Sequence, residues 1–135
     1  MSMSKTFGTE NADGSITLGT AGNVGADTIW AQASGSIDVS SVVGYLSLQF
    51  TAGNTSNALT GDITLYVIPS LDGGTDYSSS TEMIPVCVIQ APGTTTTTEI
   101  CSFDVTPYTD IRVGVQNSDE TYGADCTLSY RTVSL

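Results

Sequence analysis

Histidine is absent from this chain of 135 residues, and basic residues are scarce, since only 3 stand against 14 acids for a net charge of -11. Without histidine, the chain lacks Ser-His and Cys-His nucleophile pairs and histidine metal ligands. The only lysine, Lys5, lies in a weakly patterned segment, which argues against a buried Schiff-base lysine. Nucleic acids and anionic membrane surfaces attract clustered Lys and Arg. We therefore predict neither as a partner.

Patterns that hold cofactors or span membranes are also missing. No run of roughly eighteen apolar residues occurs, and Gly73-Gly74 lacks the following Lys-Ser/Thr of a phosphate loop. Asp72 and Asp76 flank these glycines and could suit a hard cation, but their spacing is not that of an EF-hand, which favours a hydrogen bond from Asp72 to the turn backbone instead. The Asp119-Glu120 pair shows no sign of the cleft that a glycosidase needs. We predict no enzyme activity, catalytic residue, metal or cofactor.

The residues that are present are typical of a β-protein. Hydrophobic residues make up 39% of the chain and charged residues only 13%. Thr, Val, Ile and Tyr are abundant, and these types are enriched in strands. No window shows a sustained helical period. A chain of this length suits one domain with one core, so we expect a single all-β domain.

Short alternating segments, separated by turns rich in Gly, Pro and Asn, predict the strands. The clearest is 42–51, in which Leu46, Leu48 and Phe50 share one face. Pro85 predicts an edge position for its strand. Such strands favour an antiparallel β-sandwich of jelly-roll type, with an immunoglobulin-like topology as the alternative. The predicted strands are 15–18, 36–39, 42–51, 62–69, 83–90, 99–105, 110–116 and 125–134.

The predicted strand 62–69 is apolar on both of its faces. Ile63, Leu65 and Val67 share one face, and Thr64, Tyr66 and Ile68 share the other. We expect a central strand that is covered on both sides. Pro69 should end it, because proline has no N–H for the ladder.

The first part of the chain differs from the rest. Residues 1–28 are polar, Gly-rich and weakly patterned, and predict an extended N-terminal arm before a domain over 29–135. A frayed terminus and an arm that becomes ordered against a neighbouring subunit both fit this composition. At the junction, Trp30 is either a core anchor or an interface anchor.

Three cysteines, Cys87, Cys101 and Cys126, each fall inside a predicted strand. Their odd number, with no recognisable secretory signal, favours buried and reduced thiols in a reducing cytoplasm. One disulfide with one remaining thiol is the alternative. The five threonines at 94–98 predict an exposed hairpin limb, or else an edge that adds to a strand of another subunit.

The run Leu65-Tyr66-Val67-Ile68-Pro69-Ser70, followed by Leu71-Asp72-Gly73 and Tyr77, resembles a pattern in small accessory virion proteins of tailed bacteriophages. The resemblance extends over 43–133 and is strongest over 65–77. Members of this group are single β-sandwiches that decorate or cement a capsid. The resemblance implies a homo-oligomer, with a trimer favoured, that is made in the host bacterial cytoplasm. It also implies binding to the major capsid protein on the outer surface of the virion.

Under this interpretation, the protein is a non-enzymatic capsid decoration protein that joins neighbouring capsomers and stabilises the head. A surface charge of one sign then serves either solubility or contact with a basic partner. The alternative is a carbohydrate-binding or receptor-binding β-sandwich module on a phage tail, in which Trp30, Tyr45, Tyr66 and Tyr77 could stack on sugar rings. The expected interface residues are Ile29, Trp30, Ser70, Leu71, Asp72 and Tyr77.

Overall fold

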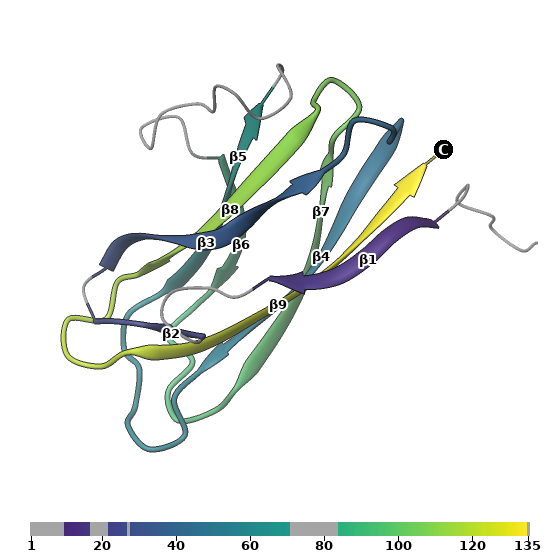
Figure 1. Cartoon of the computed structure of the whole chain (residues 1–135). Helices are drawn as coiled ribbons and strands as arrows, with labels where there is room; N and C mark the ends of the chain where they lie inside the picture. Colours follow the sequence, from purple (N-terminus) through teal and green to yellow (C-terminus); the bar gives the residue numbers. More distant parts are fainter. Residues whose placement is uncertain (1–9, 17–21, 27, 71–83, 135) are drawn as a thin grey trace, which may run out of the picture.

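A computed structural model describes residues 10–16, 22–26, 28–70 and 84–134, which form two antiparallel β-sheets stacked as layers (Figure 1). The larger sheet contains, in order, β1 (Glu10–Ile16), β9 (Ala124–Ser134), β4 (Gly44–Gly53) and β7 (Thr97–Asp104), and β2 (Asn23–Val24) also pairs with β9. The smaller sheet contains β3 (Thr28–Asp38), β8 (Asp110–Asn117), β5 (Ile63–Ser70) and β6 (Ile84–Ile89).

This strand order is that of a jelly roll. With the short β2 set aside, the first, last, third and sixth long strands form the larger sheet, and the second, seventh, fourth and fifth form the smaller one. The prediction of an antiparallel, jelly-roll-like sandwich is therefore confirmed. In the part of the chain described above, no helix is long and apolar enough to cross a membrane.

The core lies between the two sheets and is built from alternate residues of strands such as β4, β8 and β9. Leu46, Leu48 and Phe50 of β4 are fully buried, as predicted, and they belong to one hydrophobic cluster with residues from both sheets. From β8, the cluster receives Ile111, Val113 and Val115, which are also fully buried. Burying one such side chain contributes about 1.5–3 kcal/mol. Burial of these two inner faces therefore holds the sheets together.

Strand β5 is central and covered on both faces, as predicted. Ile63, Leu65 and Val67 contact the core, while Ile68 on the other face is only 5% exposed. Pro69 does not end the strand, because Pro69 still pairs with Ile111.

The position of Pro69 within the ladder explains this difference. The Ser118 N–H donates to the Asp62 carbonyl oxygen, so even-numbered residues of β5 bond β8 and odd-numbered residues face β6. The pairing described for β6 stops at Ile84 with Val67. Pro69 therefore costs no hydrogen bond to β8.

Part of the predicted N-terminal arm lies in the sandwich. Of residues 1–28, the structure describes 10–16, 22–26 and Thr28, and both β1 and β2 pair with β9. The Cys126 N–H donates to the Gly22 carbonyl oxygen at 2.7 Å, and Val24 is fully buried in the core. For these residues, the prediction of a separate arm has to be corrected. Backbone groups make these pairs, so a polar sequence can form them without an apolar period.

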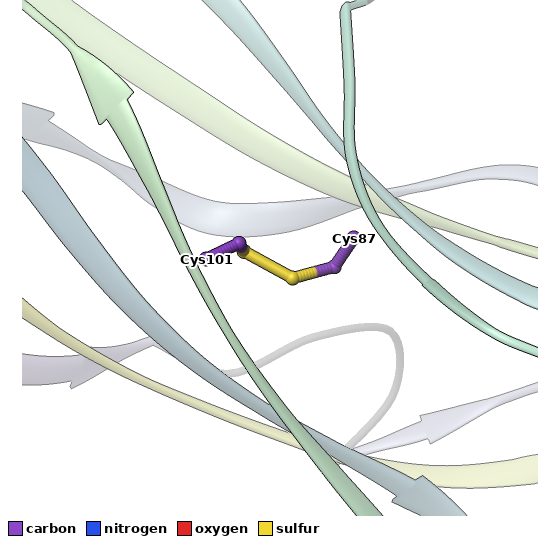
Figure 2. Close-up of a disulfide and its surroundings, with 2 residues drawn as sticks. All are labelled: Cys87 and Cys101. Carbon is purple, nitrogen blue, oxygen red and sulfur yellow. A yellow bond between two sulfur atoms is a disulfide. The ribbon is translucent and has the colours of Figure 1, made fainter.

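Cys87 of β6 and Cys101 of β7 form a disulfide with their Cα atoms 6.2 Å apart, as Figure 2 shows. The preference for three reduced thiols was therefore wrong, and the alternative of one disulfide is observed. Both strands are edge strands, one from each sheet, and the jelly-roll order places them at the same side of the sandwich. Sequence spacing alone does not reveal that neighbourhood. Cys126 is free and buried, as expected.

We predict that reducing this disulfide lowers the free energy of unfolding by about 3 kcal/mol, because it closes a chain loop of about 15 residues in the unfolded state. Urea unfolding with and without a phosphine reductant measures the loss. The double variant Cys87→Ala/Cys101→Ala serves as the control, since its unfolding should not respond to reductant. An unchanged midpoint for the reduced natural protein would contradict the prediction.

We also predict the number of thiols that react with a maleimide. The native protein should show none, because burial raises the pKa of the Cys126 thiol to about 12, with a further contribution from the Asp125 charge. Denaturation without reductant should expose the single thiol of Cys126, and denaturation with reductant should expose all 3. Mass spectrometry of the labelled protein counts them. Three labels without reductant would show that the disulfide is absent in solution.

Candidate functional site

The outer face of the larger sheet presents mostly polar side chains to solvent. Since inner residues alternate with outer ones, the positions between the core residues of β7, β4 and β9 all point away from the core. None of these outward side chains is buried. We call this surface the polar face. It consists of Thr98, Ile100, Ser102 and Asp104 of β7, Tyr45, Ser47, Gln49 and Thr51 of β4, and Thr127, Ser129, Arg131 and Val133 of β9.

Strand register arranges the polar face in four rows of three residues. Tyr45 lies between Asp104 and Val133 at one end, and Gln49 lies between Ile100 and Ser129 in the middle. Neighbouring strands are about 4.8 Å apart, and successive outward residues about 6.7 Å. The face therefore extends for about 20 Å along the strands and about 10 Å across them.

The chemistry of the polar face suits a ligand that has both apolar surfaces and hydroxyl groups. Tyr45 is 43% exposed, so its ring can stack while its hydroxyl bonds. The Gln49 amide and the surrounding hydroxyls supply donors and acceptors. Thr51 and Thr98 already bond one another at 2.8 Å, which fixes that row. The Thr106 N–H donates to Asp104 at 2.9 Å and holds the pKa of that carboxyl below its usual value.

The polar face carries little net charge, although the chain as a whole has a net charge of -11. It contains one acid, Asp104, and one base, Arg131. The polar-face residues by themselves therefore carry no net formal charge.

Asp119, at one end of the sandwich, is a structural carboxylate. Asp119 is 2% exposed, and its Oδ1 accepts hydrogen bonds from the Thr121 and Tyr122 N–H groups at 2.9 and 2.8 Å. Its Oδ2 accepts from the Thr60 and Gly61 N–H groups at 2.8 and 3.2 Å. These donors hold the pKa of Asp119 far below its usual value, the Tyr122 and Thr121 N–H groups contributing most. With its oxygens occupied in this way, Asp119 is not available as a catalytic group.

Gly61 and Asn117 complete this loop junction. A Cβ at Gly61 would overlap the backbone of Ser118 and Asp119, so the close approach requires glycine. The buried Asn117 amide donates to the Val24 and Tyr122 carbonyl oxygens at 3.1 and 3.0 Å. The side chains of Asp119 and Asn117 thus connect three separate parts of the chain, at Val24, at 60–61 and at 121–122.

We predict that Asp119→Asn destabilises the protein by about 1–3 kcal/mol at neutral pH, because an amide NH₂ replaces an acceptor among backbone donors. The lowered folded pKa means that the carboxylate stabilises the fold above its unfolded pKa of about 3.9, and that this contribution is lost as pH falls below it. The fall in melting temperature between about pH 5 and about pH 3 should therefore be smaller for the variant than for the natural protein.

Glu120→Gln is the matched control for this prediction. Glu120 is the exposed neighbour of Asp119 in the same loop. Its replacement should leave both the stability and the pH response nearly unchanged. Equal pH responses for Asp119→Asn and the natural protein would remove the stabilising role of the charge.

The three predicted interface residues that the structure describes lie in two separate places. Ile29 and Trp30 lie in β3, next to Thr28, which pairs with Asn117, whereas Ser70 pairs with Asp110. These two pairs lie at opposite ends of β8, roughly 20 Å apart at the usual rise of a strand. Ser70 is only 2% exposed, and its carbonyl oxygen accepts from the Thr109 N–H. Leu71, Asp72 and Tyr77 lie outside the described residues.

The aromatic residues expected to stack on sugars are also separated. Tyr45 lies on the polar face, while Tyr66 lies on the outer face of the smaller sheet and donates its hydroxyl to Gln116 at 2.8 Å. The position of Trp30 is known only as a strand position in β3, and Tyr77 again lies outside the described residues. A stacking site formed by all of them is therefore not observed.

A metal site is not found in the described ranges, in which no group of three or more acidic or cysteine side chains is arranged to hold an ion. Asp62 instead accepts a hydrogen bond from the Ala91 N–H at 3.0 Å. The sequence did contain the signal for the polar face, namely the positions that alternate with the core residues of β4. It did not show which strands extend that face on either side.

Comparisons with known proteins support the fold. No protein-family model matches the chain, and no curated protein matches it. Among solved structures, the chain is similar to the CBM22-1 xylan-binding domain of Xyn10C from Paenibacillus barcinonensis. The TM-score is 0.54 at 12% identity, and the match covers 98% of this chain and 99% of that domain. At this identity, the likeness shows a shared β-sandwich fold across essentially the whole chain.

Proposed function

We propose that this protein is a non-enzymatic binding module that holds an uncharged glycan on the polar face. The observation that supports the proposal is the surface itself, where an exposed tyrosine, an amide and rows of hydroxyls lie on regularly paired strands with one acid and one base. A sugar ring has apolar C–H faces and hydroxyl edges, which these groups complement. The similar fold of a xylan-binding domain supports the same choice.

The charge of the molecule narrows the class of glycan. A total of -11 repels anionic polymers at long range, and that repulsion is strongest at low salt. Neutral chains, of which xylan is one test ligand, meet no such barrier. Affinity electrophoresis in gels that contain xylan, a neutral glucan or polygalacturonate tests this class directly. Retardation of the protein by a neutral polymer, but not by polygalacturonate, supports the proposal. A protein that binds no member of a broad glycan array contradicts it.

We predict that Tyr45→Ala and Gln49→Ala each weaken glycan binding, the first by up to about tenfold, since an aromatic stack contributes about 0.5–1.5 kcal/mol. Isothermal titration calorimetry with the polymer that retards the protein measures the change in affinity. Tyr122→Ala is the matched control, because Tyr122 is similarly exposed, at 38% against 43%, but lies in a loop away from the polar face. Equal losses for Tyr45→Ala and Tyr122→Ala would place the site elsewhere.

Capsid decoration is the second candidate function, and the resemblance over 65–77 is what favours it. Most of that range lies outside the described residues, so binding to the major capsid protein, location on the outer capsid surface and synthesis in a bacterial cytoplasm stay predictions. Co-sedimentation with assembled phage heads tests this candidate. Saturable binding of the protein to heads, together with unretarded migration of the protein in all glycan-containing gels, would favour decoration over the glycan module.

A further inference from the structure

We propose that β7 is a docking edge for a second copy of this chain, so that two copies join by antiparallel pairing of β7 with β7. The two-fold axis passes beside Ile100. This partner is a second protein chain and not a glycan: it pairs with the backbone edge of β7, whose outward side chains Thr98, Ile100 and Ser102 also belong to the polar face.

The four long edge strands of the described sheets differ in regularity, with the two-residue β2 set aside. β1, β3 and β6 each pair with a register shift, and β6 also contains Pro85. Bulges and prolines of this kind protect sheet edges from further pairing. β7 pairs with β4 along its whole length, from Thr97 to Asp104, with no register shift and no proline. β7 is therefore the edge that is straight enough to accept another strand.

Hydrogen-bond parity shows which groups of β7 point outward. The Val105 N–H donates to the Gly44 carbonyl oxygen, so odd-numbered residues of β7 bond β4. The N–H and C=O groups of Thr98, Ile100 and Ser102 then point away from the sheet. No strand in the described ranges pairs with that side of β7. With the two-fold axis at Ile100, Thr98 pairs with Ser102 of the second copy, Ile100 with Ile100, and Ser102 with Thr98.

Side chains favour this register over its neighbours. Ile100 is 73% exposed, the highest value among the large hydrophobic residues whose burial the structure describes, and it would pack against Ile100 of the second copy. Glu99 would face Cys101, so no acid opposes an acid. A register centred on Glu99 would instead place two glutamates directly opposite each other, which is destabilising. The disulfide at Cys101 ties the middle of this edge to β6.

Charge sets the conditions under which the pair forms. Each copy carries -11, so association is opposed at low ionic strength and favoured when salt screens the repulsion. Each copy uses one edge, and the two-fold arrangement closes after two copies. The expected assembly is thus a dimer that becomes stronger with salt, in contrast to the trimer that the resemblance implies.

Sedimentation equilibrium of the full oxidised chain, from low micromolar to millimolar concentration and at low and high salt, tests the proposal. The expected result is a rise from monomer to dimer mass that is larger at high salt. Ile100→Lys should abolish the rise, because it adds charge at the axis. Val88→Lys is the matched control, since it makes the same kind of change at an exposed position, 46% accessible, on the other edge strand β6 and should leave the rise intact.

Amide exchange resolved by NMR keeps the test independent of variant folding. At high concentration, the N–H groups of Thr98, Ile100 and Ser102 should gain protection, while those of odd-numbered residues in β7 should be protected at every concentration. A monomer under all conditions, a trimer, or a dimer that both lysine variants retain would overturn the proposal. So would even-numbered amides of β7 whose exchange does not change with concentration.

Discussion

Burial of one face of each sheet against the other is the interaction on which the rest of this structure depends. Leu46, Leu48 and Phe50 can lie in the core only if the residues between them point outward. The same alternation in β9 and β7 builds a solvent-exposed surface directly behind the core. The polar face is therefore held in place by the packing beneath it, and its rows are as well ordered as the strands that carry them.

Two polar side chains maintain the end of the sandwich where loops would otherwise separate. Asp119 and Asn117 satisfy backbone groups from three parts of the chain. Because buried donors and acceptors are costly when unmatched, these contacts fix the loop positions as firmly as apolar packing fixes the strands. Asp119 thus serves to close one end of the fold.

The sequence predicted β4, β8 and β9 from their alternation, because side-chain burial leaves a period of two, and it predicted β5 from apolar residues on both of its faces. It predicted the edge position of β6 because proline removes a donor. It predicted a strand at 15–18 that overlaps only the end of β1, and it did not predict the rest of β1 or β2, because their polar residues join the sheet through backbone bonds to β9. The disulfide depended on which edges adjoin, and that follows from the jelly-roll order, not from the spacing of Cys87 and Cys101.

Only the part of the candidate site on β4 could be predicted from the sequence, because the pairing of distant strands is not apparent from sequence spacing. Tyr45 and Gln49 were visible as the outward half of β4, but their neighbours on β7 and β9 come from positions about 50 and 80 residues further along the chain. The geometry also relates the two proposals. Pairing of β7 with β7 would place two polar faces side by side in one continuous sheet, about 4.8 Å apart at the junction. A glycan chain long enough to cross that junction would contact both copies, and its second contact would be intramolecular, which strengthens binding without any new type of interaction.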